Sequence, residues 1–429
     1  MRYRSTGDPT RLVSLGEAVL NSLPPDRGLY VPETLPKLPA SFWSRRGNLS
    51  FSELAFEIAR PFLEPDLDPD AIRSVVEGAI TFDAPLVPVA EGIAVLELFH
   101  GPTLAFKDFG ARFMARLMPK LRAQADDELT VLVATSGDTG AAVAAGFFGV
   151  EGVRVFVLFP KGRVSDVQEQ QLTTFGGNIT AVEVEGTFDD CQALVKRAFL
   201  DPELARRCTL TSANSINIAR LIPQAFYYAR AWQQRAARGQ NPAFCVPSGN
   251  LGNLTAGLLA RGMGLPVDRF VAATNANDGF VRFLERRPLP EGPASRTLSN
   301  AMDVAIPSNL VRIEALFGGD LAALGDVVKG WAFDDDATLE TMARVHRDFG
   351  YVLDPHTAVG WRAAEALRSS EPDRDVVVLA TAHPAKFPEA VTRAVGHAPE
   401  PPPQLARALA QPKRSVAIPA DLDALRARL

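Results

Sequence analysis

The chain has 429 residues, 47% of them hydrophobic and 22% charged, with a formal net charge of -5 at pH 7. This length suffices for two domains or three small ones, and the composition is typical of a globular enzyme. The charge balance excludes a global basic field that would attract nucleic acid, and no stretch approaches the ~18 consecutive apolar residues of a membrane span.

Residues 1–95 form a proline-rich N-terminal region that we expect to be helical and extended in parts, packed on the body of the protein. Apolar residues at helical spacing predict helices over 12–23 and 51–62. Between them, residues 28–32 are typical of an extended segment that ends at proline. The N-terminus lacks the apolar core of a signal peptide, so we expect a cytoplasmic protein without nucleic-acid or membrane partners.

One lysine has a distinctive local context. Lys107 lies between two phenylalanines, just after a Gly-Pro turn, within residues 100–110. Partial desolvation there would disfavour the ammonium and free an amine able to form a Schiff base with an aldehyde cofactor. Most lysines are solvated surface groups, so this interpretation depends on the loops that follow.

From residue 129 onward, strands, glycine-rich loops and helices alternate, which predicts an α/β fold with parallel sheets. Two of the glycine-rich loops lie far apart in the sequence, so we expect two sheets with a ligand held between domains. We place a smaller α/β domain at 96–215 and a larger one at 216–429, which ends in a surface extension after residue 398. The predicted strands are 129–134, 154–159, 179–184, 243–246, 270–274 and 376–380, and the predicted helices are 141–148, 166–175, 189–200, 216–235 and one ending near 261.

The loop 248–253, Ser-Gly-Asn-Leu-Gly-Asn, ends a predicted strand and begins a helix. Its two glycines let backbone N–H groups approach a ligand, and a helix N-terminus favours phosphate. A tight turn with an asparagine cap is the alternative explanation. The loop matches neither the Rossmann pattern nor the P-loop, which disfavours a dinucleotide or a nucleoside triphosphate.

Three further loops present polar groups at strand ends. Residues 136–140 offer hydroxyls, amides and Asp138, residues 211–220 end in Arg220, and Thr381 directly follows a strand. If Ser215 caps the next helix, that helix N-terminus and Arg220 together would bind an anion. Each loop taken alone is also explained as an ordinary cap or turn.

Metal binding and disulfide bonding have no support in the sequence. Cys191, Cys208 and Cys245 lack the spacing of a disulfide framework or a Cys-x-x-Cys pair. The five histidines include no His-x-x-x-His pair. We therefore expect no metal site.

Taken together, these segments resemble threonine synthases, pyridoxal-phosphate enzymes of fold type II, and most closely the longer bacterial and fungal branch of that family. The resemblance implies two parallel-sheet domains with the cofactor between them, plus an N-terminal extension. It implies a carbon–oxygen lyase that converts O-phosphohomoserine and water to threonine and phosphate by γ-elimination and β-addition, the last step of threonine biosynthesis. The segments that carry it follow the family order along the chain: 28–33, 98–110, 136–140, 160–165, 215–220, 248–253 and 381–387.

Residue by residue, the resemblance implies a cofactor site and a substrate site. Lys107 would bind pyridoxal phosphate covalently and later move protons, Thr381 would face the pyridine nitrogen, and Asp138 would lie beside the ring hydroxyl. The remaining cofactor contacts would be Gly249, Asn250, Leu251, Gly252 and Asn253 to its phosphate, and the substrate contacts would be Ser136, Thr139, Ser215, Arg220 and Asn250.

Two residues depart from the family pattern. Leu251 stands where phenylalanine is common in this branch, which should matter little because the loop binds through its backbone. Asp138 replaces a neutral amide, and its carboxylate beside the ring hydroxyl would be repelled unless it were protonated or offset by Lys107.

Two alternatives stay open at this point. A phospho-lyase with the same cofactor would release 2-oxobutyrate instead of threonine. A non-catalytic protein would bind a phosphorylated amino acid and would have no need of Lys107. The sequence also leaves the oligomeric state open between monomer and dimer.

Overall fold

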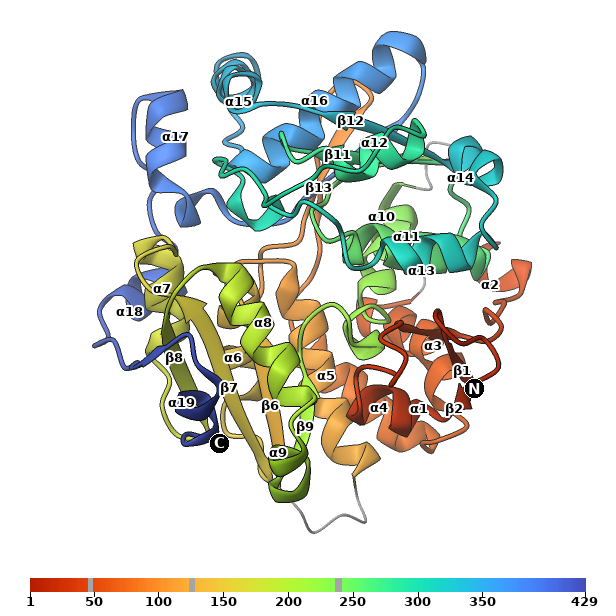
Figure 1. The fold of residues 1–429 in the computed structure, drawn as a ribbon. Coiled ribbons are helices and arrows are strands. Elements are labelled where there is room, and N and C mark those ends of the chain that lie inside the picture. Colours follow the sequence, from red (N-terminus) through yellow and green to blue (C-terminus); the bar gives the residue numbers. More distant parts are fainter. Residues whose placement is uncertain (45–48, 123–127, 236–240) are drawn as a thin grey trace.

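The computed structural model describes residues 1–44, 49–122, 128–235 and 241–429. Two sheets of mainly parallel strands form two lobes, one above the other in Figure 1, and a small antiparallel sheet belongs to the N-terminal region. The architecture confirms the predicted α/β fold with two parallel sheets. None of the helices in these described ranges has both the length and the apolar character needed to cross a membrane.

The five-stranded sheet lies in the lower lobe of Figure 1. Its strands and covering helices are β6 (Leu129–Ala134), β7 (Val153–Pro160), β8 (Ile179–Glu185), β9 (Thr209–Ser212), β14 (Val416–Pro419), α5 (Lys107–Leu121), α6 (Asp138–Phe147), α7 (Asp166–Thr173), α8 (Phe188–Phe199), α9 (Pro202–Arg207) and α19 (Leu422–Arg426). The strand order is β14-β8-β7-β6-β9, all parallel. Alternate residues serve the two faces: Leu132 packs with α8 and α19, and Val131 packs with α5 and α6.

The six-stranded sheet lies in the upper lobe. Its elements are β4 (Leu86–Ala90), β5 (Ile93–Glu97), β10 (Ala243–Pro247), β11 (Arg269–Thr274), β12 (Val328–Ala332), β13 (Val376–Ala380), α10 (Gln224–Arg235), α11 (Gly252–Gly262), α12 (Gly279–Leu284), α13 (Leu310–Leu316), α14 (Leu321–Val327), α15 (Asp335–Phe349), α16 (Pro355–Ser370) and α17 (Pro388–Val395). The order is β12-β11-β10-β13-β5-β4, and only β4 runs antiparallel to its neighbour among these strands. Val378 packs toward α15 and α16, whereas Val377 packs toward α10 and α11.

The N-terminal region packs against the lower lobe and also reaches α10. Its elements are β1 (Tyr3–Ser5), β2 (Leu12–Val13), β3 (Tyr30–Pro32), α1 (Leu15–Leu20), α2 (Ala40–Ser44), α3 (Phe51–Leu63) and α4 (Pro69–Ala79). The predicted helix over 51–62 is confirmed, and it begins with a capping box of Ser50 and Glu53. The helix predicted over 12–23 is shorter, because residues 12–13 pair with β1 and Ser14 caps α1.

The helix predicted over 216–235 is wrong in its first part. A 3₁₀ turn, η1 (Ile218–Arg220), comes first, and α10 begins only at Gln224. Pro223 explains the break, because it lacks an N–H group and disfavours helical backbone at the residue before it. Asn217, and not Ser215, is the cap of the turn.

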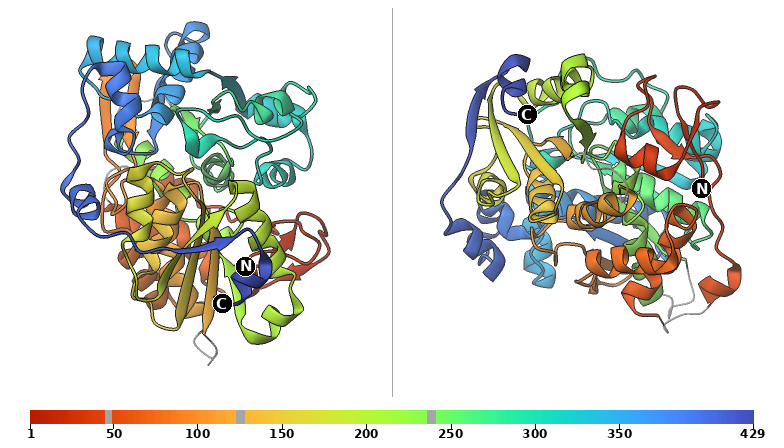
Figure 2. Two further views of the ribbon diagram at one scale, coloured as in Figure 1. Left: turned by 60° about the vertical axis from the view of Figure 1, so that its left-hand side comes forward. Right: turned by 90° about the horizontal axis from the view of Figure 1, so that it is seen from below.

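The C-terminal tail is more than the predicted surface extension. After α18 (Pro403–Leu409), the chain returns to the lower lobe, where β14 pairs with β8, as Figure 2 shows. Ile418 and Leu425 are buried there. Sheet membership therefore crosses the predicted domain boundaries, since 86–97 joins the upper sheet and 416–419 the lower one. The division at 95 and 215 stays a prediction.

Candidate active site

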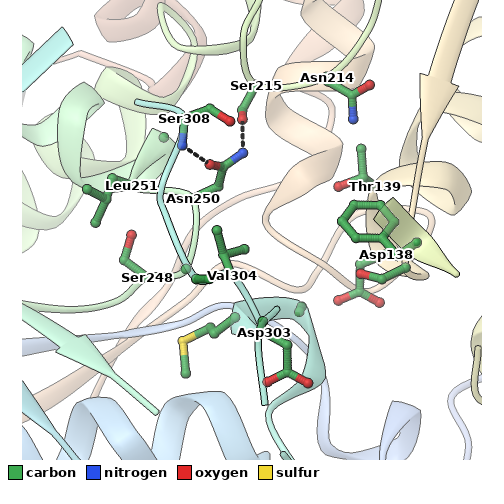
Figure 3. A pocket seen from close by; sticks show the side chains of 18 of the residues that line it. Asp138, Thr139, Asn214, Ser215, Ser248, Asn250, Leu251, Asp303, Val304 and Ser308 are labelled. Carbon is green, nitrogen blue, oxygen red and sulfur yellow. Dashed lines mark hydrogen bonds between the residues drawn. The ribbon is translucent and has the colours of Figure 1, made fainter. Parts of the chain in front are cut away.

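Every residue that the sequence analysis assigned to a site lines one cavity of about 590 Å³. These residues are Lys107, Ser136, Asp138, Thr139, Ser215, Arg220, Gly249, Asn250, Leu251, Gly252, Asn253 and Thr381. Figure 3 shows Asp138 and Thr139 on one side of the cavity and Asn250 and Leu251 on the other. The loops involved follow β6, β9, β10 and β13, whose carboxyl ends are where α/β sheets hold ligands.

Lys107 is the first residue of α5, and the turn before it is fixed by a buried carboxylate. Asp108 accepts hydrogen bonds from the Thr103 N–H at 2.8 Å and the Thr103 hydroxyl at 2.7 Å. Glycine is required at position 101, because a Cβ there would lie 2.4 Å from an oxygen of Asp108. The Lys107 Nζ lies 4.9 Å from the centre of the Phe106 ring, and its side chain is 15% exposed.

Asp138 stands between two lysines. Its Oδ2 lies 3.8 Å from the Lys107 Nζ, and its Oδ1 lies 2.8 Å from the Lys386 Nζ. Gln168 also donates to Oδ1, at 3.0 Å. Lys386 is fully buried and donates a second hydrogen bond to the Thr103 carbonyl, at 2.8 Å. Lys386 lies in the segment 381–387, but no role for Lys386 was predicted from the sequence.

The charges in this cluster shift the pKa values of Lys107 and Asp138. Burial lowers the pKa of Lys107, and Lys386 and Arg220 add to that shift, while Asp138 opposes it. Burial alone would raise the pKa of Asp138, but Lys386 and Lys107 outweigh it and hold that pKa below its usual value. Asp138 is therefore an ionised carboxylate offset by two lysines, where the sequence analysis considered Lys107 alone.

The loop 248–253 presents unpaired backbone donors to the cavity. In the described part of the chain, the N–H groups of residues 249–253 donate no hydrogen bond. Leu251 adopts a left-handed backbone with φ of 59°, and Gly249 packs so closely that a Cβ would lie 2.6 Å from the Met302 Cα. Helix α11 begins directly after Leu251 without a side-chain cap. Unpaired N–H groups at a helix N-terminus form a site for a phosphate or another anion.

Asn250 links this loop to its neighbours. Its Nδ2 donates to the Ser215 hydroxyl at 3.0 Å, and its Oδ1 accepts from the Ser308 N–H at 2.5 Å, as drawn in Figure 3. Asn309 donates to the same Ser215 hydroxyl at 3.2 Å and to the Asn250 carbonyl at 2.9 Å. The loops 215–217 and 248–253 are therefore joined into one wall of the cavity.

A buried arginine behind that wall connects it to the N-terminal region. Arg312 is 0% exposed and donates to the Tyr30 carbonyl at 3.0 Å and the Ser215 carbonyl at 2.9 Å. It also donates to the Asn309 amide oxygen at 2.7 Å and to the Ile216 carbonyl. The N-terminal strand β3 thus supports the loop that carries Ser215. No motif around Arg312 marks this role, since an isolated arginine is usually a surface group.

Arg220 reaches the cavity from η1, and Thr381 reaches it from the end of β13. Arg220 is buried, donates to the Ala213 carbonyl, and its Nε has no hydrogen-bond partner among the described residues. Burial lowers the pKa of Arg220 to about 10, although Asp108 opposes the shift. The Thr381 carbonyl accepts from the Phe106 N–H at 2.9 Å, while its hydroxyl has no partner within the described chain. The Thr381 hydroxyl is therefore free for a ligand, whereas the Arg220 Nε packs against Gly110.

The structure adds cavity residues that the sequence analysis missed. His356 lines the cavity, with Nδ1 2.8 Å from Asp354 and Nε2 accepting the Ala301 N–H at 3.2 Å. Asp303 also lines the cavity, and burial raises its pKa to about 6, while hydrogen bonds from Thr297 oppose the shift. These residues follow loops with no glycine-rich motif, so nothing in the local sequence marks them.

Three family comparisons together match most of the chain. Residues 85–382 match the family Pyridoxal-phosphate dependent enzyme, residues 2–80 match Threonine synthase N terminus, and residues 357–428 match Threonine synthase, C-terminal. The first match includes Lys107, Asp138, the loop 248–253 and Thr381. The chain and these families therefore correspond across the whole cavity.

Individual proteins are similar over the same length. Threonine synthase of Escherichia coli strain K12 is 43% identical over 428 residues, covering 99% of this chain and 98% of that protein. The crystal structure of threonine synthase from Escherichia coli has a TM-score of 0.92 at 42% identity and covers 100% of this chain and 99% of that one. The crystal structure of pyridoxal-phosphate-bound threonine synthase from Brucella melitensis has a TM-score of 0.93 at 36% identity and covers 100% of this chain and 98% of that one.

Proposed function

Since this chain belongs to the threonine synthase family of pyridoxal-phosphate-dependent enzymes, we propose that its cavity converts O-phosphohomoserine and water to threonine and phosphate. The observation that carries the proposal is that one cavity holds both a desolvated lysine and a row of unpaired backbone donors. An amine and an anion site in one cavity suit a cofactor with an aldehyde and a phosphate.

The residues present fit that cofactor. The Lys107 amine would hold it covalently, and the N–H groups of residues 249–253 would bind its phosphate. The close packing of Gly249 on Met302 leaves no room for a side chain in this cradle. The hydroxyl of Thr381 would face the pyridine nitrogen and Asp138 the ring hydroxyl. When bound, pyridoxal phosphate supplies an electron sink that lets protons leave carbon atoms of the substrate.

Lys107 would move those protons. The reaction removes protons from Cα and Cβ and returns protons to the product, so one mobile base in the cavity can serve several steps. An amine must be uncharged before it accepts a proton, and the lowered pKa of Lys107 favours that state. Its side chain keeps only 15% of its surface exposed, which limits exchange of the proton with water.

The substrate phosphate would bind at the wall formed by the loops 215–217 and 248–253. Ser215 and Asn250 are already joined by a hydrogen bond, and Arg220 lines the same cavity with a buried positive charge. Thr139 lies across the cavity in Figure 3, and Thr139 and Ser136, which both line the cavity, would complete the substrate contacts. A site with a buried guanidinium and neutral hydrogen-bond donors attracts a phosphate, whereas a site lined by carboxylates would repel it.

A product assay tests the proposal. The purified protein, supplied with pyridoxal phosphate and O-phosphohomoserine, should release threonine and phosphate in equal amounts. The Lys107→Ala variant should release neither, whereas Lys413→Met, which removes an exposed lysine paired with Glu169, should behave as the parent protein. Phosphate with 2-oxobutyrate and no threonine would show a phospho-lyase instead, and no phosphate at all would contradict the proposed substrate.

A further inference from the structure

We propose that Lys386 is a positioning residue that keeps Lys107 in its uncharged form by occupying the carboxylate that would otherwise hold the Lys107 ammonium. The inference deepens the proposed function and rests on it, because Lys107 is taken there as the group that moves protons. Lys386 does not need to touch the cofactor or the substrate, and it acts through Asp138.

The three charged groups of this cluster are largely buried. Lys386 is 0% exposed, the Asp138 side chain is 3% exposed and the Lys107 side chain is 15% exposed. Two ammonium groups and one carboxylate would carry a net positive charge in a site largely shielded from water. Burying uncompensated charge is costly, so the site favours the loss of one proton.

The two lysines differ in their hydrogen-bond acceptors. The Lys386 Nζ has two acceptors at 2.8 Å, the Asp138 Oδ1 and the Thr103 carbonyl. The Lys107 Nζ has no hydrogen-bond acceptor among the described residues, and its ion-pair partner, the Asp138 Oδ2, lies 3.8 Å away. The geometry therefore engages Asp138 with Lys386 and leaves the Lys107 amine free to lose its proton.

Hydrogen bonds to one oxygen of Asp138 hold its carboxylate in a fixed orientation. Its Oδ1 receives both Lys386 and the Gln168 side chain, which donates at 3.0 Å. Gly137 makes room for this contact, because a Cβ at that position would lie 2.5 Å from the Gln168 amide carbon. With Oδ1 occupied, only Oδ2 faces Lys107, and at a distance longer than a hydrogen bond. Asp138 is thereby held close to Lys107 without capturing its proton.

The other charges that act on Lys107 belong to different elements. Arg220 disfavours the Lys107 ammonium, as Lys386 does, while Asp354 and Asp138 favour it. His356 lines the same cavity and is paired with Asp354. Removing Lys386 alone shifts this balance toward a charged Lys107, because one positive neighbour disappears and Asp138 becomes available.

The pH dependence of Lys107 acetylation tests the inference. In the full-length chain freed of cofactor, the rate at which acetic anhydride modifies Lys107 would be followed by mass spectrometry across a pH series. For Lys386→Met, the midpoint should move to higher pH than in the parent protein. For Asp138→Asn it should move to lower pH, and the double variant should lie between the two single variants. Lys413→Met should leave the midpoint unchanged.

The holoenzyme provides a second measurement. Its visible absorbance reports the protonation of the nitrogen that joins Lys107 to the cofactor, and the midpoint of that titration should move in the same directions. Opposite shifts, or no shift in Lys386→Met or in Asp138→Asn, would overturn the inference. If Lys386→Met fails to fold, Lys386→Gln, which removes the charge and keeps a donor beside Asp138, should move the midpoint in the same direction, and no shift in it would overturn the inference. These readouts do not depend on product formation, so they separate failure of this inference from failure of the proposed function.

Discussion

The two walls of the cavity present polar groups of opposite kinds, charged side chains on one and backbone N–H groups on the other. The lysine wall (Lys107 and Asp138, with Lys386 buried behind them) consists of charged side chains that offset one another at 2.8 and 3.8 Å. The amide wall (residues 249–253) has no charged side chain and offers backbone N–H groups that the fold leaves unpaired. The first wall can change its protonation, whereas the second has a fixed shape and a fixed polarity.

This difference separates the two tasks of the cavity. A group that moves protons must have neighbours that tune its charge, and the pKa of Lys107 is lowered by its surroundings. A cradle for a phosphate needs donors that do not titrate, and backbone amides meet that need. Changes to the lysine wall should therefore alter rates and pH dependence, and changes to the amide wall should alter binding.

The largest expected effect is loss of the reaction in Lys107→Ala. Because the variant lacks the amine that holds the cofactor and moves protons, threonine formation should fall by roughly 10³-fold or more. The measurement is the steady-state rate at saturating substrate, with thermal unfolding as the control for folding. Retention of more than about a tenth of the parent rate would contradict the role of the lysine wall.

A smaller effect is expected in the pH dependence of stability, through Asp108. Burial raises the pKa of Asp108 to about 6 from its ordinary value of 3.8, although hydrogen bonds from Thr103 oppose the shift. As the pH rises from about 4 to about 6, the unfolded chain loses this proton first, so the folded state is destabilised by at most ~3 kcal/mol. Below about pH 4 the carboxyl is protonated in both states and this penalty is absent.

The variant Asp108→Asn cannot titrate, so it isolates that contribution. The free energy of unfolding of the parent protein minus that of the variant should fall as the pH rises from about 4 to about 6. Urea unfolding of both proteins at several pH values measures the difference. A difference that stays constant, or that grows with pH, would show that the carboxyl is not buried against Thr103 in the way the structure describes.

On the amide wall, Asn250→Ala should weaken substrate binding more than turnover. The variant loses the hydrogen bonds to the Ser215 hydroxyl and the Ser308 N–H, so the two loops should no longer hold a common geometry. We expect KM for O-phosphohomoserine to rise roughly tenfold, with kcat less affected. The control is Asn241→Ala, at an exposed asparagine bonded to Asp268. A fall confined to kcat would assign Asn250 to the chemistry.

The smallest effect is expected for Ser215→Ala. The hydroxyl accepts from Asn250 and Asn309, but Arg312 still holds the backbone of residues 215–216 through two carbonyls. We expect KM to rise roughly threefold, since one neutral hydrogen bond is lost and the loop stays in place. An unchanged KM would show that the Ser215 hydroxyl does not meet the substrate.

The sequence predicts the central strands well and the remote pairings poorly. Strands β6 and β13 have the bounds expected from their apolar, β-branched runs. Strand β14 was missed because four residues in a polar tail give no period, and its partner β8 lies more than two hundred residues away. Helix α5 is not among the predicted helices, because residues 100–110 are interpreted only for the chemistry of Lys107.

The site shows the same limit. A glycine-rich loop can be recognised from a short stretch of sequence, so the amide wall could be predicted from residues 248–253 alone. Lys386 could not, because its burial depends on Asp138 and Thr103, which come from distant parts of the chain. A lysine beside an apolar residue has the same local sequence whether it is buried or solvated. The tuning of the lysine wall is therefore a property of the fold and not of any motif.

The most direct test of the two-wall account is the binding of pyridoxine 5′-phosphate, which has the ring and phosphate of the cofactor but no aldehyde. Calorimetric titration would compare the parent protein with Lys107→Ala, Gly249→Ala and the control Gly325→Ala, where a Cβ meets nothing within 4 Å. The account predicts that Lys107→Ala and Gly325→Ala bind this compound about as the parent does. Gly249→Ala should bind it at least roughly tenfold more weakly, because its Cβ displaces the cradle from Met302. Normal binding by Gly249→Ala, together with lost binding by Lys107→Ala, would contradict the assignment of the phosphate to the amide wall.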